Sequence, residues 1–185
     1  MGSEKGYKSE ILNEVLRNML KLLNDNNFDS WFVSYGTLLG IIRENSCIDL
    51  DDDIDILIDI KHRNKLVQIL KENNYTINKY GRLREDTRDI VKARQSGKPS
   101  VDFYFANIKD NGDYVDTWND VIWTDCLPLQ KKNWNDVVLY IPNNYEKKLI
   151  GRYGDDWNVP KGEGYKGPLQ TDPSSKNKVG RNKII

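Results

Sequence analysis

The sequence has few residues that could form a zinc site or a disulfide framework. It contains one histidine, His62, and two cysteines, Cys47 and Cys126. So few soft ligands argue against structural zinc, and two cysteines are expected to remain free thiols. No apolar run approaches the roughly 18 residues that span a bilayer, and the N-terminus has no hydrophobic signal region. A soluble, cytoplasmic protein without a membrane span is therefore expected.

The sequence also lacks an excess of charge of either sign. Lys plus Arg and Asp plus Glu both total 28, so no basic field would draw the protein onto nucleic acid or anionic lipid. Binding of nucleic acid is not expected, whereas a specific phosphate site is compatible with this balance. A length of 185 residues suits one domain with its own core.

Hydrophobic periodicity predicts an α+β fold with a mixed β-sheet and helices mainly on one face. Helices are expected at 9–24, 37–45, about 60–72 and 144–153. Strands are expected at 31–35, 53–59, 75–80, 89–95 and 100–108, with a hairpin within 129–142. Residues 1–8 are interpreted as a tag or disordered terminus, 9–160 as the domain, and 161–185 as an extended tail.

Five aspartates occur within the seven positions 49–55 and lead into the strand-like stretch "DIDILID". Residues two apart on a strand share a face and lie about 6.6 Å apart, so Asp53 and Asp55 can point together, and Asp51 can join them. Two carboxylates roughly 4 Å apart repel by about 4 kcal/mol at an effective dielectric of 20. A divalent cation would remove that repulsion, and oxygen ligands favour Mg²⁺, or Mn²⁺, shared with a substrate phosphate.

Two other interpretations of the acidic run are open at this stage. Acidic runs are most often solvated loops or partners of nearby Arg and Lys, although the alternation with isoleucine ties this run to a half-buried strand. A calcium loop would use Asp51, Asp53 and Asp55 as its first ligands. That pattern needs a glycine where Ile56 stands and a glutamate where His62 stands, so the calcium interpretation fails.

Two further features fit a phosphate-binding site. In "YGT", Gly36 and Thr37 are predicted at a glycine turn that opens a helix, where backbone N–H groups and a hydroxyl can meet phosphate oxygens. In "SVDFYF", Asp102 lies between apolar residues of a predicted strand. An acid in that position is usually a salt-bridge partner or a metal ligand from a neighbouring strand.

Together these features resemble the nucleotidyltransferase fold of the polymerase-beta type. The stretch "YGTLLGIIRENSCIDLDDDIDILI" resembles the LicD/fukutin pattern, GTLLG-x-x-R followed by I-P-W-D-D-D-x-D. Asp49 and Leu50 stand where the family has Pro and Trp, so the loop into the strand is expected to differ in shape. The segments "VDFYF" and "RYGDDWNVP" extend the resemblance more weakly.

The resemblance implies a Mg²⁺-dependent phosphotransferase that moves a phospho-alcohol group from a CDP-activated donor to a sugar hydroxyl of a glycan. Asp53 and Asp55 would bind the metal and orient the diphosphate, and Asp102 would complete the metal site and accept the proton from the hydroxyl. Gly36 and Thr37 would hold diphosphate oxygens.

Three basic residues are also candidates for binding the donor. Arg43 follows Gly36 by about two helical turns, so it could approach the donor's negative charge. Lys92 and Arg94 lie two apart on one strand face and could support the leaving CMP. A surface or structural role is the alternative for each of them.

Two other functions remain open from the sequence. A D-x-D glycosyltransferase would use a nucleotide-sugar, although such domains usually have a longer nucleotide-binding half before the motif. A catalytically silent nucleotide- or glycan-binding domain of the same fold would need none of the three aspartates, Asp53, Asp55 and Asp102.

Overall fold

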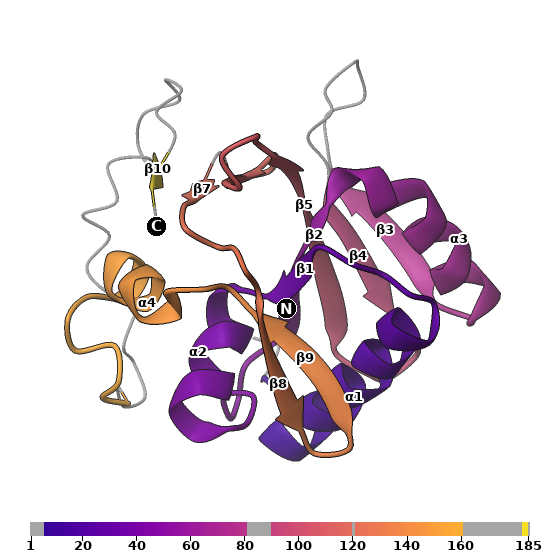
Figure 1. Ribbon diagram of the computed structural model, residues 1–185. Coiled ribbons are helices and arrows are strands. Elements are labelled where there is room, and N and C mark those ends of the chain that lie inside the picture. The colour runs from indigo at the N-terminus through magenta and orange to yellow at the C-terminus, as the bar shows by residue number, and fades with distance from the viewer. Residues whose placement is uncertain (1–5, 81–89, 120, 161–182, 185) are drawn as a thin grey trace.

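The computed structural model of the chain describes residues 6–80, 90–119, 121–160 and 183–184 (Figure 1). The helices are α1 (Ser9–Asp25), α2 (Tyr35–Glu44), the 3-10 turn η1 (Ile60–His62), α3 (Arg63–Glu72) and α4 (Tyr145–Tyr153). The strands are β1 (Trp31–Val33), β2 (Asp53–Asp59), β3 (Thr76–Tyr80), β4 (Ile90–Arg94), β5 (Ser100–Ile108), β6 (Tyr114–Asp116), β7 (Val121–Trp123), β8 (Gln130–Trp134), β9 (Val137–Ile141) and β10 (Lys183–Ile184).

The main sheet is mixed, as the sequence predicts. β5 is its centre: β2 pairs with it in parallel along residues 100–106, while β4 and then β6 pair with it antiparallel along the other edge. β1 and β3 extend the sheet antiparallel to β2 and β4, and β7 lies beyond β6. The α+β prediction with a mixed sheet is confirmed, and the parallel β2–β5 pair is the part that positions the site.

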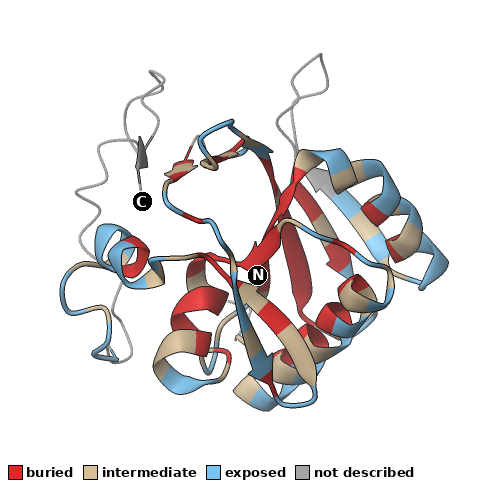
Figure 2. Cartoon of the chain, viewed as in Figure 1, coloured by how far each residue is buried: buried red, intermediate tan, exposed pale blue. Residues whose placement is uncertain are grey.

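The main core lies between one face of this sheet and the helices α1 and α3. Every second residue of β2 and β5 faces it and is fully buried: Ile54, Ile56, Ile58, Val101, Phe103 and Phe105. α1 packs against β2 and β5 through a stripe of leucines and Met19, and Figure 2 shows this stripe in red. The Arg63 guanidinium of α3 lies 5.9 Å from the Phe105 ring centroid, on the same face.

A separate two-stranded sheet, β8–β9, packs against α1 and β1. It confirms the predicted hairpin within 129–142. Trp31 of β1 meets Tyr140 of β9 edge-on, with ring centroids 5.0 Å apart. The short strands β6 and β7 were not predicted, because three residues are too few to show a period.

The ends of the chain differ in part from the predicted boundaries. Tyr7 forms an antiparallel bridge with Asp51, so ordered pairing begins before residue 9. Residues 1–5 and 161–182, and thus most of both predicted termini, lie outside the described residues, whereas β10 pairs in parallel with β7. None of the helices in the described ranges has the length and apolar character needed to cross a membrane.

Candidate active site

The sheet register brings three of the predicted site residues into one row. Asp55 of β2 is paired with Asp102 of β5, and Asp102 is paired with Lys92 of β4. Asp53 lies two residues before Asp55 on the same face, opposite Ser100. The parallel β2–β5 pair therefore gathers carboxylates that lie about fifty positions apart in the sequence.

These carboxylates are withdrawn from water. Asp55 is 8% exposed and Asp102 1% exposed, while Asp53 is half-buried. Burial raises the pKa of Asp55 well above its usual range, and the neighbouring carboxylates of Asp53 and Asp102 raise it further. Burial and the charge of Asp102 raise the pKa of Asp53 to about 7. A solvated acidic loop would show neither the burial nor the raised pKa values.

Lys92 supplies part of the missing counter-charge. Its ammonium contacts the Asp102 carboxylate and lies 3.6 Å from Asp53 Oδ2. The Ser100 hydroxyl donates to the other oxygen of Asp102 over 3.0 Å. The salt-bridge interpretation of Asp102 thus holds, and Lys92 also approaches Asp53 of the acidic run, but one ammonium cannot neutralise the whole group.

The start of α2 is joined to Asp55 by two reciprocal hydrogen bonds. The Gly36 N–H donates to Asp55 Oδ2 over 3.2 Å, and the Asp55 N–H donates to the Thr37 hydroxyl oxygen over 2.8 Å. A Cβ atom at position 36 would lie 3.1 Å from Asp51 Oδ2 and 3.7 Å from Asp55 Oδ2. Glycine leaves room here for the close approach of the Asp51 and Asp55 carboxylates, and a larger residue would press on the Asp51 carboxylate.

The predicted glycine turn itself lies elsewhere. α2 begins at Tyr35, one residue before Gly36, and Tyr35 has the positive φ of 44°. Gly36 stands in the first turn of the helix. The prediction placed the turn at the glycine because glycine is the usual residue at positive φ.

The predicted basic residues differ in their distance from the acidic group. Arg43 stands in the last turn of α2 and pairs with Glu44, at the opposite end of the helix from Gly36. Arg94 is exposed at the end of β4, on the same strand face as Lys92. The structure therefore brings Lys92 to the carboxylates, leaves Arg94 on the adjoining surface and places Arg43 away from both.

Residues that the sequence interpretation missed form an aromatic wall beside the acids. Tyr104 follows Asp102 on the same face of β5, and its ring meets Tyr35 edge-on at 5.0 Å. The Arg152 guanidinium of α4 lies 4.8 Å from the Tyr35 ring centroid. Burial raises the pKa of Tyr153 to about 12, with the charges of Asp55 and Asp51 adding to the effect. In the sequence, the segment "RYGDDW" resembles the family pattern and could have pointed to these residues. The sequence did not show where this segment lies in the fold.

The acidic group suits a hard divalent cation. Among the described residues, Asp51, Asp52 and Asp53 have carboxylate oxygens within 4.8 Å of one another, at the entrance to β2; the predicted ligands Asp55 and Asp102 are not in that set. Burial also raises the pKa of Asp51. Because carboxylate oxygens are preferred by Mg²⁺ and Mn²⁺ and the group repels itself without a cation, the residues present fit such an ion.

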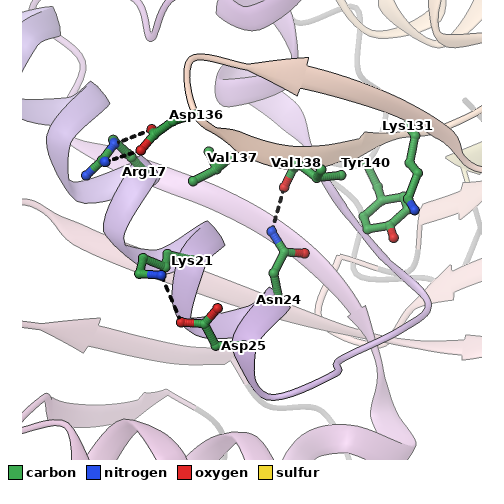
Figure 3. Close-up of a pocket in the computed structure, with 9 residues that line it drawn as sticks. All are labelled: Arg17, Lys21, Asn24, Asp25, Lys131, Asp136, Val137, Val138 and Tyr140. Carbon is green, nitrogen blue, oxygen red and sulfur yellow. Dashed lines mark hydrogen bonds and ion pairs between the residues drawn. The ribbon is translucent and has the colours of Figure 1, made fainter.

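A pocket of about 390 Å³ lies on another part of the molecule, between α1 and the hairpin (Figure 3). Four of its charged residues are paired, Arg17 with Asp136 and Lys21 with Asp25, and the Lys131 ammonium lies over the Tyr140 ring. None of the predicted site residues lines it. The pocket thus has no part in the candidate site.

The fold has a counterpart among solved structures. A lincomycin-bound lincosamide antibiotic adenylyltransferase, LnuA, matches 78% of this chain and 86% of its own, with a TM-score of 0.55 and 14% sequence identity. At that identity the likeness shows the fold alone, and it confirms the nucleotidyltransferase-like architecture.

Two curated proteins are similar in sequence. An uncharacterized protein of Rickettsia prowazekii (strain Madrid E) is 27% identical over 159 residues, and mannosyltransferase regulator 4 of Saccharomyces cerevisiae (strain ATCC 204508 / S288c) is 30% identical over 158. Each match covers 83% of this chain, but only 57% of the first relative and 12% of the second. Residues 29–144 match the LicD/FKTN/FKRP nucleotidyltransferase domain. The chain therefore belongs to the LicD/FKTN/FKRP family and carries its nucleotidyltransferase domain.

Proposed function

We propose that the protein is a Mg²⁺-dependent phosphotransferase that moves a phospho-alcohol group, phosphocholine-like or a polyol phosphate, from a CDP-activated donor to a sugar hydroxyl of a glycan. The observation that carries the proposal is the buried pair Asp55 and Asp102 on adjacent parallel strands, with Asp53 beside them. Family membership supports a phosphotransferase or nucleotidyltransferase-like role. The cytidine donor and the glycan acceptor come from the family resemblance.

Asp53, Asp55 and Asp102, with Asp51 at the loop, would hold the cation. When bound, Mg²⁺ would neutralise the diphosphate and polarise its phosphoryl oxygens. Support for this set comes from the pKa values of Asp53 and Asp55, which are raised first by burial and then by repulsion from the neighbouring carboxylates.

In the proposed reaction, Asp102 accepts the proton of the attacking sugar hydroxyl. The sugar oxygen forms a bond to the phosphorus that carries the alcohol, the bond from that phosphorus to the CMP oxygen breaks, and CMP leaves with the bonding electrons. Asp102 is held for this role by the Ser100 hydroxyl and the Lys92 ammonium. Lys92 can also offset charge that develops on the leaving CMP.

We assign a donor-binding role to Arg152 as well. Its guanidinium lies over the ring of Tyr35, the residue before Gly36. Within the described part of the chain Arg152 contacts the aromatic side chains of Tyr35 and Tyr153, and no carboxylate forms an ion pair with it. Arginine is suited to binding phosphate oxygens because its guanidinium has a planar set of N–H groups. The negative charge of the CDP-activated substrate would therefore lie near Lys92 and Arg152, and Gly36 and Thr37 would contact its diphosphate at the start of α2.

A thermal-shift screen tests the proposal. CDP-choline, CDP-ribitol, CDP-glycerol, CTP, UDP-sugars and GDP-sugars would each be added with and without Mg²⁺, because a ligand of the native state raises the unfolding temperature. Stabilisation by a CDP-alcohol that requires Mg²⁺ is expected. Stronger stabilisation by a UDP- or GDP-sugar would favour the glycosyltransferase, and stabilisation by none would contradict a nucleotide-activated donor.

A further inference from the structure

The backbone of Tyr35, beside the site, has an unusual conformation. Its φ of 44° lies in the left-handed region, which a bulky aromatic residue rarely adopts. The Ser34 N–H still pairs with the Asp55 carbonyl oxygen of β2 over 3.0 Å, and α2 has begun by the next residue. The whole change from strand to helix therefore occurs at Tyr35, and its surroundings must hold it there.

A buried carboxylate holds the hydroxyl end of Tyr35. The Tyr35 hydroxyl donates to Asp116 Oδ2, and Asp116 is fully buried. The other oxygen of Asp116 accepts from the backbone N–H groups of Trp118, over 2.8 Å, and Asn119, over 3.2 Å. The Asn119 amide also donates to Asp116 Oδ2 and to the Tyr35 oxygen. Asp116 thus has a full set of donors, and the hydroxyl of Tyr35 is one of them.

Aromatic side chains fix the ring of Tyr35. Tyr104 and Trp123 meet it edge-on, with centroids 5.0 and 5.3 Å away, and Arg152 lies over it. Such edge-on contacts remain when the hydroxyl is removed. The hydrogen bond to Asp116 and the ring contacts can therefore be separated by a Tyr35→Phe substitution.

We propose that Tyr35 and Asp116 are positioning residues, whose hydrogen bond fixes the strand-to-helix turn and thereby places the Gly36 N–H against the Asp55 carboxylate. The next two residues after Tyr35 make the reciprocal bonds to Asp55. A rotation at Tyr35 would move both donor and acceptor away from that strand. The consequence for ligand binding rests on the proposed function, whereas the consequence for the turn does not.

The test uses Tyr35→Phe, Asp116→Asn and the double variant, with Tyr140→Phe as the control, because Tyr140 lies in the hairpin and contacts Trp31. Asparagine keeps the size of Asp116 but turns an NH₂ group toward the tyrosine hydroxyl or toward Asn119. The first measurement is amide hydrogen exchange of Gly36 by NMR, without ligand. The second is the Kd of CDP with Mg²⁺, and urea unfolding measures global stability in parallel.

Each single variant should speed Gly36 exchange and raise the Kd by about tenfold or more, the factor that corresponds to one hydrogen bond to a charged group. The double variant should add little to either single change, because both substitutions weaken the same contact between positions 35 and 116. Tyr140→Phe should match the parent. Parent-like exchange at Gly36 in both single variants would overturn the inference, even with lower global stability. If the parent does not bind CDP, the proposed function fails, and the exchange data still decide the inference.

Discussion

Replacing Asp53 with asparagine should stabilise the metal-free protein at alkaline pH. Folding raises the pKa of Asp53 from 3.8 to about 7, so the folded protein holds a proton that the unfolded chain has already released. Stability is therefore lost as pH rises from about 4 through about 7. The neutral amide of Asp53→Asn has no such loss.

The size of the effect follows from the two pKa values. Their difference corresponds to at most about 4 kcal/mol at 1.36 kcal/mol for each pH unit. Asp53 is 22% exposed and lies 3.6 Å from the Lys92 ammonium, so solvent screening and loss of that contact reduce the expected gain to on the order of 2 kcal/mol.

Urea unfolding in EDTA at about pH 5 and about pH 8 measures this gain. The parent should lose more stability between the two values than Asp53→Asn, in which only the other carboxyl groups with raised pKa values, Asp55 and Asp51, still contribute to the loss. Asp110→Asn, in an exposed turn, is the matched control and should follow the parent. Adding Mg²⁺ at pH 8 should stabilise the parent more than Asp53→Asn. An Asp53→Asn protein less stable than the parent at pH 8 in EDTA would refute the reasoning.

Four further outcomes are expected. Asp102→Asn should lower turnover at least about a hundredfold, because general-base assistance is worth 10² to 10⁴, while donor binding should fall much less; near-parent turnover in a steady-state assay would remove it from the mechanism. Arg152→Ala should raise the donor KM by about tenfold, the value of one charge-assisted hydrogen bond, whereas Lys147→Ala on the same helix should not. Gly36→Ala should weaken Mg²⁺ binding measured by calorimetry, because its Cβ would lie 3.1 Å from Asp51 Oδ2. Apparent Mg²⁺ affinity should rise with pH up to about 7, because protons compete with the metal at Asp53; a flat profile would contradict the metal assignment.

Local patterns predicted much of the fold. Alternation identified β2, helical spacing identified α1, and a hairpin was predicted within 129–142, where β8 and β9 lie. These elements depend on residues close in sequence, so their periods are visible in the chain. The same alternation placed Asp53 and Asp55 on one face.

Features that depend on contacts between residues far apart in the sequence were harder to predict. That Asp55 stands beside Asp102 follows from the parallel register of β2 and β5, which no local pattern fixes. Tyr35 was not expected at the turn, because its positive φ is held by Asp116, eighty-one positions away. Arg152 reaches the site because α4 folds back onto it.

Isothermal titration of CDP into the parent and into Asp55→Asn, each in Mg²⁺ and in EDTA, tests most directly whether the carboxylate group forms a metal-dependent nucleotide site. Asparagine keeps the shape of Asp55 and an oxygen that can accept from the Gly36 N–H, so the fold should survive. We expect CDP to bind the parent in Mg²⁺ only, and binding to Asp55→Asn to be at least about tenfold weaker, because even loss of a group that supports a metal ligand typically costs about 10- to 100-fold in metal affinity. Equal binding in EDTA, or parent-like binding by Asp55→Asn, would contradict the proposed site.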